Sequence, residues 1–305
     1  MRKFLYLSIA LLSMTSWASE QSQKVTDSMI TNQLKSFAYH WYAKFDNGTT
    51  IDELTPYLPE EKLEFIYPQA KITSLNELTS QFEAAWMATD ANAHQVEEIA
   101  IYKSSENNVY DIITPHTYYI KRKNGTFGEL SIVSRMRVRL GLKTRLDPKA
   151  ELPKIESYLV LFQNAKSDDV TQKISALRHK TFSENDAKSF VHKWFENADL
   201  GNANAMIDMV SNQPLGINLF GNSIDTKDAL KDYLEQNAAA QKWAIHKPHN
   251  IVVTPTPEGF SVRFIVHFEG DIQGMGNLSL NNVTNWLLVE ENGELRLRDY
   301  SLSLL

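Results

Sequence analysis

The chain has 305 residues, of which 43% are hydrophobic and 22% charged, so it can bury a core and form about two domains. Its 37 acidic residues outnumber its 31 basic residues and give a net charge of −6, which argues against nucleic acid as a partner because phosphate groups bind to basic surfaces. Cysteine is absent, which excludes disulfides, thiolate metal sites, a cysteine nucleophile and a cysteine-linked lipid anchor.

The first 18 residues have the order of a secretory signal peptide. Arg2 and Lys3 supply a positive start, residues 4–12 form a short apolar run, and Ala18 ends a small-residue cleavage motif. The run is shorter than the ~20 apolar residues that cross a bilayer, so we expect cleavage after Ala18 and no stable membrane insertion. The short basic start is typical of bacteria and predicts a secreted protein of the periplasm.

After the leader, the sequence reads as one unit written twice. Similar segments occur in the same order in both halves of the sequence. Residues 35–42 match 188–195 at a separation of 153 residues, and the separation decreases along the chain to 142 residues for Ile155 and Leu297. The matches between these ends include His94 with His246 and His116 with His267. We therefore predict a tandem duplication, with a first domain at 19–165, a linker at 166–182 and a second domain at 183–305.

Each copy is expected to begin with an amphipathic helix followed by two shorter helices. Apolar residues recur at three- and four-residue steps over 30–45 and 190–198, which places them on one helix face. Shorter helices follow at 51–58 and 203–210. The third helices are expected to start at Ser74, where Glu77 completes a capping-box spacing, and at Thr226. Within the linker, the spacing of Val170, Ile174 and Leu177 predicts a short helix with one docked face.

Beyond the helices the hydrophobic period changes to two, which is typical of half-buried antiparallel strands. Strands are expected at 99–103, 109–113 and 130–140 in the first copy and at 260–268, 286–289 and 295–304 in the second. Turn residues separate several of them, as at Asn124-Gly125 and Asn292-Gly293. Helices followed by an antiparallel meander predict an α+β fold in each copy.

This order of elements resembles the SnoaL-like group of the nuclear transport factor 2-like superfamily, which also contains ketosteroid isomerase-like proteins. Segments 246–253 and 286–297 carry the resemblance most clearly, and it extends over 185–305 and, through the repeat, over 29–163. It implies two tandem cone-shaped domains, each with three N-terminal helices packed on a curved antiparallel sheet around a largely apolar pocket. Members often pair through their sheets, which implies an internal pseudo-dimer of the two copies and leaves a further oligomer open.

The isomerase members of this superfamily carry a carboxylate base after the second helix. Tyr67 and Leu219 stand at that position in this chain, and Glu64 is three residues away. The resemblance therefore does not extend to that base in either copy.

Histidine and tyrosine side chains are the candidates for a ligand pocket. Because dehydratase members of the superfamily use a histidine, the resemblance implies His116 or His267 as a base, with Tyr39 as a hydrogen-bond donor. The alternative is a strand histidine bonded to backbone, and a structural hydrogen bond is what we expect for His94 and His246. The eight pocket candidates are Tyr39, His40, Tyr67, Tyr110, His116, His192, Arg263 and His267.

Arg135, Arg137 and Arg139 alternate with apolar residues and give one strand a cationic face. Such a face could bind a carboxylate or a phosphate, whereas a solvated outer face or a charged sheet edge is the favoured interpretation. No histidine–carboxylate spacing predicts a metal site, and we expect no cofactor, since glycine-bearing 271–276 reads as a hairpin.

Three functions remain open from the sequence. The favoured hypothesis is a secreted protein that binds a small apolar or amphipathic ligand without catalysis. The first alternative is an enzyme of the isomerase or dehydratase type with a pocket histidine as base. The second is an assembly or interaction module whose cones are filled by their own side chains.

Overall fold

The computed structural model describes residues 2–59, 63–141 and 152–305, with side chains described from residue 21 onward. The helices are α1 (Arg2–Asp46), α2 (Ile51–Leu54), α3 (Leu75–Ala88), α4 (Thr171–Ala176), α5 (Glu184–Leu200), α6 (Ala203–Asp208) and α7 (Lys227–Ala240), with a 3-10 turn η1 (Thr55–Tyr57). The strands are β1 (Phe65–Tyr67), β2 (Ala70–Ile72), β3 (Thr89–Val96), β4 (Ala100–Lys103), β5 (Val109–Arg122), β6 (Phe127–Arg139), β7 (Lys154–Lys166), β8 (Arg178–His179), β9 (Phe182–Ser183), β10 (Gly216–Leu219), β11 (Asn222–Ile224), β12 (Gln241–Thr256), β13 (Gly259–Ile272), β14 (Gly276–Glu291) and β15 (Glu294–Leu304).

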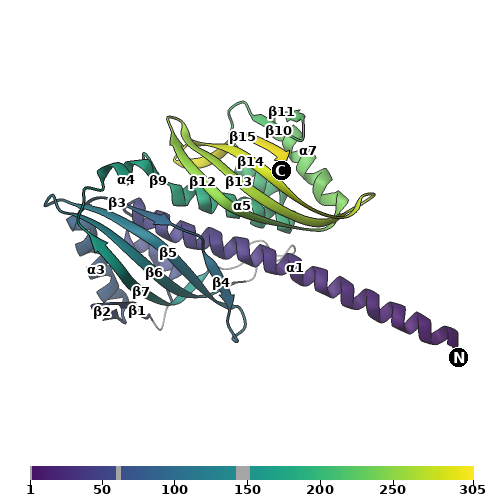
Figure 1. Cartoon of the computed structure of the whole chain (residues 1–305), viewed down its shortest axis with the longest axis horizontal. Coiled ribbons are helices and arrows are strands. Elements are labelled where there is room, and N and C mark those ends of the chain that lie inside the picture. Colours follow the sequence, from purple (N-terminus) through teal and green to yellow (C-terminus); the bar gives the residue numbers. More distant parts are fainter. Residues whose placement is uncertain (1, 60–62, 142–151) are drawn as a thin grey trace.

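The predicted α+β class is confirmed, with one curved sheet in each half of the chain (Figure 1). The first sheet has the strand order β2-β1-β7-β6-β5-β3, with β4 beside β5, and the second has the order β11-β10-β15-β14-β13-β12. The two orders correspond position by position, including the parallel pairing of β1 with β7 and of β10 with β15. Origin by duplication stays a prediction, but the halves can be compared strand by strand.

Local sequence explains where the helices begin and end. Ser74 caps α3 by accepting a hydrogen bond from the Glu77 amide, and Thr226 caps α7 in the same way, as predicted. Ser183 and Asp186 form a capping box at the start of α5, and Gly201 ends that helix in the left-handed conformation that glycine adopts easily.

The predicted docked helix between the copies is α4. Val170, Ile174 and Leu177 are buried and pack with Ala93 and Tyr119 of the first half. α4 therefore attaches to the outer side of β3 and β5 and leaves both interiors untouched.

The two halves meet through α1 and α5. Hydrogen-bonded pairs along the crossing are Ser28 with Asp199, Asn32 with His192, Ser36 with Ser189 and Asn47 with Asp186. Because the residue numbers in these pairs increase along α1 while they decrease along α5, the two helices are antiparallel. Ser36 and Ser189 occupy equivalent positions, and their hydroxyls lie 3.1 Å apart, so a pseudo-twofold axis passes between them.

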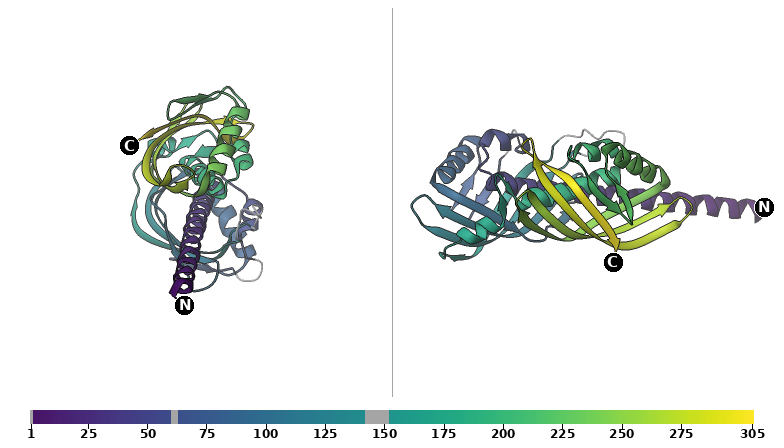
Figure 2. Two further views of the ribbon diagram at one scale, coloured as in Figure 1. Left: turned by 90° about the vertical axis from the view of Figure 1, so that its right-hand side faces the viewer. Right: turned by 90° about the horizontal axis from the view of Figure 1, so that it is seen from above.

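This packing corrects the implied pairing through sheets, since the contact between the described parts of the two halves runs mainly through α1 and α5. The helix faces that meet carry serine, asparagine and histidine, which bond across the boundary instead. α1 lies along that boundary, and its N-terminal part projects beyond both halves (Figures 1 and 2). The predicted leader is continuous with α1, and its cleavage stays a prediction. Within the described residues, no helix has the length and apolar content needed to cross a bilayer.

The strand registers correct the predicted pairing of His116 with His267. His94 pairs with Tyr118 on β5, whereas His246 pairs with Phe268 on β13. The residue that corresponds to His116 is therefore Val266. His267 is one position further on, and a shift of one residue moves a strand side chain to the opposite face of the sheet.

Candidate functional site

The second half encloses a cavity of about 380 Å³ between the helices and the concave face of its sheet. Most of its wall is apolar, with Trp194, Phe195, Leu219, Val266 and Phe268 among the lining residues. A volume of this size is in the range of sites that hold small organic molecules. The wall also includes a small set of polar side chains, namely Tyr233, Asn237, Gln241, His246, Asn282 and Tyr300.

His246 is the one lining residue whose ring is held by a buried carboxylate. Its Nδ1 lies 2.8 Å from Oδ1 of Asp199, and the same oxygen accepts the backbone amide of His246 at 3.0 Å. The ring stacks on Phe195 and meets the edge of Phe268. The Nε2 atom makes no hydrogen bond within the described part of the chain, so it is available to a molecule in the cavity.

Asp199 lies in the last turn of α5 with its side chain fully buried, and burial raises the pKa of its carboxyl while the hydrogen bond from His246 lowers it. Its second oxygen accepts hydrogen bonds from Ser28 at 2.8 Å and from the Asn32 amide at 3.3 Å, both on α1. The Asn32 amide also donates to the carbonyl oxygen of His246 at 2.9 Å. The first half of the chain thus supplies donors to the His246–Asp199 pair of the second half.

The first half contains the counterpart of this pair. Nδ1 of His94 lies 2.7 Å from Oδ1 of Asp46, and the amide of Asn185 on α5 donates to Oδ2 of Asp46 and to the carbonyl oxygen of His94. Each half therefore donates hydrogen bonds to the aspartate–histidine pair of the other, and we call these two sets of hydrogen bonds the clasp. Its presence in both copies shows that these aspartates help to join the halves.

The interiors of the two halves differ at several corresponding positions, three of which we compare. Phe45 stands where the second half has Ala198, one residue before the corresponding aspartate of each helix. By strand register, His116 stands where the second half has Val266, and Ile132 where it has Asn282. Phe45 contacts Phe82 and His94, and His116 contacts Tyr42 and His94, so these larger side chains pack against one another. Ala198, Val266 and Asn282 are smaller, and all three line the cavity of the second half.

None of the eight predicted pocket residues lines this cavity. Tyr39 and His192 are buried where α1 crosses α5, and their ring centroids are 5.7 Å apart in a stacked arrangement. The buried Nδ1 of His192 forms a hydrogen bond with the side-chain oxygen of Asn32. Burial lowers the pKa of His192 well below its usual range, and the charge of Lys35 lowers it further, so the ring is neutral.

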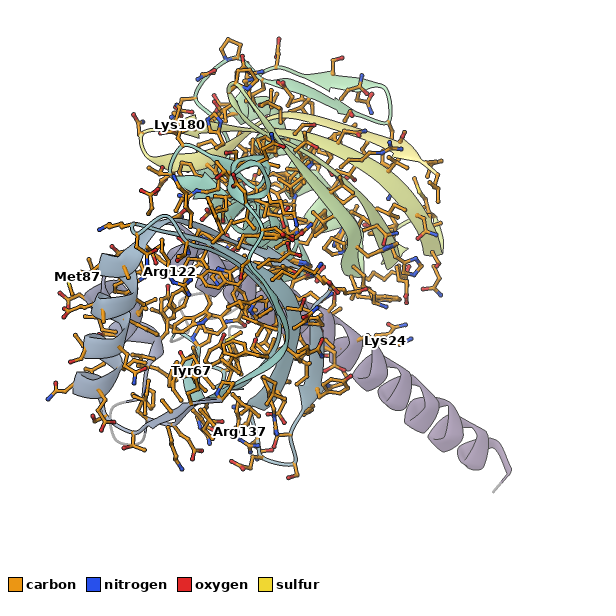
Figure 3. All side chains as sticks on the ribbon, turned by 60° about the vertical axis from the view of Figure 1, so that its left-hand side comes forward. Lys24, Tyr67, Met87, Arg122, Arg137 and Lys180 are labelled. Atoms are coloured by element: carbon orange, nitrogen blue, oxygen red, sulfur yellow. The ribbon has the colours of Figure 1, made fainter. Side chains whose placement is uncertain are left out.

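The other first-half candidates belong to that half's packed interior or its edge. Tyr110 and His116 are buried, and His116 bonds to the carbonyl oxygen of Thr114. Tyr67 lies on β1 against Tyr158, within the side chains that fill the first half (Figure 3). His40 is half-buried beside Tyr57, and burial lowers its pKa to about 4, assisted by the charges of nearby lysines.

The second-half candidates lie on the outer face of the sheet. Arg263 is exposed, and His267 bonds to Asn281 and Glu269 rather than to a group in the cavity. Both side chains point away from Val266 and Phe268, which line the cavity from the same strand.

The predicted cationic stripe is paired with carboxylates. Arg135 forms a two-point hydrogen-bonded contact with Asp111, and Arg139 pairs with Glu156. Arg137, toward one end of the first sheet in Figure 3, contacts Glu106 and Glu156. This network is the solvated outer face that the sequence favoured, with its charge already balanced. Within the described residues, no group of three histidine, aspartate or glutamate side chains could hold a metal ion.

Sequence reasoning missed Asp199, Asn282 and the role of His246 in the cavity wall. Asp199 is separated by 47 positions from His246, and no local pattern connects them. A usable clue was present in the repeat, because Asp46 and Asp199 end equivalent helices and precede equivalent histidines.

No protein-family model and no curated protein matches the chain. Among solved structures, a protein proposed to be a scytalone dehydratase from Novosphingobium aromaticivorans is similar to it at 13% identity, over 40% of this chain and 83% of that one, with a TM-score of 0.37. A protein proposed to be a dehydratase of the nuclear transport factor 2-like family from Streptomyces avermitilis shows 6% identity over 40% of this chain and 96% of that one, with a TM-score of 0.37. A nuclear transport factor 2-like protein with a cystatin-like fold from Novosphingobium aromaticivorans shows 13% identity over 40% and 81%, with a TM-score of 0.35. Two of these descriptions name the superfamily that the sequence resembles, and nothing about this chain's ligand or reaction follows from them.

Proposed function

We propose that the second half of this protein binds a small, largely apolar molecule in its cavity, and that the first half is a filled counterpart that supports it. The observation that carries the proposal is the substitution of Ala198, Val266 and Asn282 for the larger or less polar residues of the first half. These smaller residues line a cavity of about 380 Å³ beside His246, whose Nε2 makes no hydrogen bond within the described residues. An unfilled apolar space of this size would otherwise destabilise the domain.

Native mass spectrometry on gently purified protein tests this proposal. We expect an additional bound mass that disappears on denaturation. The variant Ala198→Phe copies the residue that fills the first half, and it should remain folded while losing the bound mass. A wild-type protein that carries no molecule and binds none from a panel of small aromatic compounds would contradict the proposal.

A second candidate function is proton transfer to or from the bound molecule, favoured by the contact between His246 and Asp199. A carboxylate on Nδ1 fixes the ring's tautomer and orientation, which leaves Nε2 as the atom that would accept a proton. The base would break a C–H bond, leave the electron pair on the substrate and return a proton from solvent.

Deuterium exchange separates this enzyme reading from simple binding. The copurified molecule, incubated with protein in D₂O, should acquire deuterium at a carbon-bound position, and His246→Gln should abolish the exchange. His94→Gln, in the filled first half, is the matched control and should leave the exchange rate unchanged. Exchange that persists in His246→Gln would eliminate the catalytic candidate.

We further propose export of the protein, supported by the charged, apolar and small-residue order of residues 2–18. The intact mass of the mature protein should correspond to a chain that begins at Ser19. A mature chain that retains residues 2–18 would contradict this proposal.

A further inference from the structure

The cavity wall of the second half carries no lysine, arginine, aspartate or glutamate side chain. Its polar members are the neutral side chains of tyrosine, asparagine and glutamine, together with His246. Transfer of an unpaired ion from water into such a space is strongly unfavourable, whereas a hydroxyl or carbonyl group needs only a hydrogen-bond partner. The composition of the wall therefore selects against charge in whatever it encloses.

Polar and apolar side chains line both the interior and the mouth of the cavity. Phe220 and Met275 line it while remaining 51% and 73% exposed, so they mark the opening. Asn282 and Tyr300 line it at 6% and 9% exposure and so mark the interior, whereas Tyr233, Asn237 and Gln241 are half-buried. A molecule that enters can therefore place a polar group beside Asn282.

Two polar side chains of the cavity wall, Asn282 and His246, can meet a molecule inside it. The side-chain oxygen of Asn282 is buried without a partner among the described residues and has no accessible surface toward the cavity, so Asn282 can reach a bound molecule only through its amide nitrogen. His246 is held by Asp199 through Nδ1, and its Nε2 makes no hydrogen bond within the described residues.

Resting on the proposed binding function, we infer that the ligand is an uncharged, largely apolar molecule that carries an oxygen-bearing polar group such as a hydroxyl or carbonyl, which meets Asn282. The amide nitrogen of Asn282 can donate to the oxygen of either group. A carboxylate is disfavoured because Asp199 already places a negative charge directly behind His246. An ammonium group is disfavoured because no carboxylate lies in the wall to pair with it.

Three probes of one shape and different charge test this inference. Isothermal titration of the full-length protein at pH 7.5 would use 2-naphthalenemethanol, 2-naphthoate and 2-naphthylmethylammonium. The alcohol should bind roughly 30-fold more tightly than either ion, given the free energy of burying an unpaired charge. The acid should gain affinity as the pH is lowered toward its own pKa, because its neutral form then enters.

Two leucine variants on one strand test the role of Asn282. Asn282→Leu should weaken binding of the alcohol by about 3- to 10-fold, the range expected for one hydrogen bond between neutral groups. Asn281→Leu, on the outer face of the same strand, should leave that affinity within about twofold.

The outcomes distinguish the inference from the function on which it rests. Equal affinity for the alcohol and for either ion would overturn the ligand class while leaving a binding cavity in place. Equal effects of the two leucine variants would remove Asn282 from the recognition of the polar end. No binding of any probe to the wild-type protein would contradict the proposed function itself.

Discussion

His116 is a buried histidine whose partners leave it neutral. It is 4% exposed, its Nδ1 bonds to the carbonyl oxygen of Thr114, and its ring lies against Tyr42 and His94. Burial, with a smaller contribution from the neighbouring His94, lowers the pKa of His116 from 6.5 to about 3. Protonation of this ring is therefore far less favourable in the folded chain than in the unfolded chain.

This difference predicts how stability depends on pH. Between pH 6.5 and about 3 the unfolded chain binds a proton at His116 that the folded chain does not, so the stabilisation is complete above pH 6.5 and is lost as the pH falls. His116→Val, which installs the residue found at the corresponding position of the second half, should reduce the slope of unfolding free energy against pH by up to about 1.4 kcal/mol per unit. Urea unfolding from pH 4.5 to 7 measures it, and an unchanged slope would contradict the neutral assignment.

Individual residues also mark where sequence reasoning reached its limit. The alternation of Phe260 to Phe268 correctly predicted one apolar face, and it places His267 on the opposite one. The pairing of His267 with His116 relied on residue identity, which a drifting offset makes ambiguous by one position. Because the side-chain period of a strand is two, that single step decides between cavity and solvent.

At the scale of elements, helix periodicity and capping residues predicted α3, α5 and α7 well, whereas for α1 they indicated only residues 30–45 of a helix that begins at Arg2. The strands β3 and β12 were harder, because each begins directly after a helix, with no turn residue between Ala88 and Thr89 or between Ala240 and Gln241. The contact of α1 with α5 could not be predicted from periodicity either. The polar side chains that form it are read in sequence as solvent-facing until a partner helix is known.

Asn32 is the residue through which α1 contacts three parts of the second half at once. Its amide nitrogen donates to the carbonyl oxygen of His246 and to Asp199, and its oxygen accepts from Nδ1 of His192. Asn32→Ala leaves these buried groups without that partner and should lower the free energy of unfolding by about 2–4 kcal/mol. Asn185→Ala removes the reciprocal contacts to Asp46 and His94, and we expect a loss of similar size.

Ligand binding separates the two alanine variants. Only Asn32 supports the wall of the cavity, so Asn32→Ala should weaken binding of 2-naphthalenemethanol by about 3- to 10-fold. Asn185→Ala should leave the affinity within about twofold, since its partners Asp46 and His94 lie in the first half and do not line the cavity. Equal binding by both variants would show that the clasp joins the halves without positioning His246.

At the scale of the whole molecule, the buried boundary makes the second half dependent on the first. Most of α5 is buried, including polar residues such as Ser189 and His192 that face α1. Without α1, those side chains would lose their hydrogen bonds and the apolar surface around them would meet water. The chain should therefore unfold as one cooperative unit rather than as two independent domains.

Cutting the chain in two ways separates covalent continuity from contact across the boundary. Residues 167–169 are exposed between the halves, so a protease site placed there should be cleaved while α1 stays packed on α5. The nicked protein should remain a non-covalent pair in native mass spectrometry and bind 2-naphthalenemethanol within about twofold of the intact chain, because no contact in the cavity or the clasp is removed.

A fragment of residues 183–305 alone should fail to show a cooperative unfolding transition and should not bind the probe, because Asp199 and His246 then lack Ser28 and Asn32. A monomeric, cooperatively folded fragment with full affinity would show that the second half needs no support from the first.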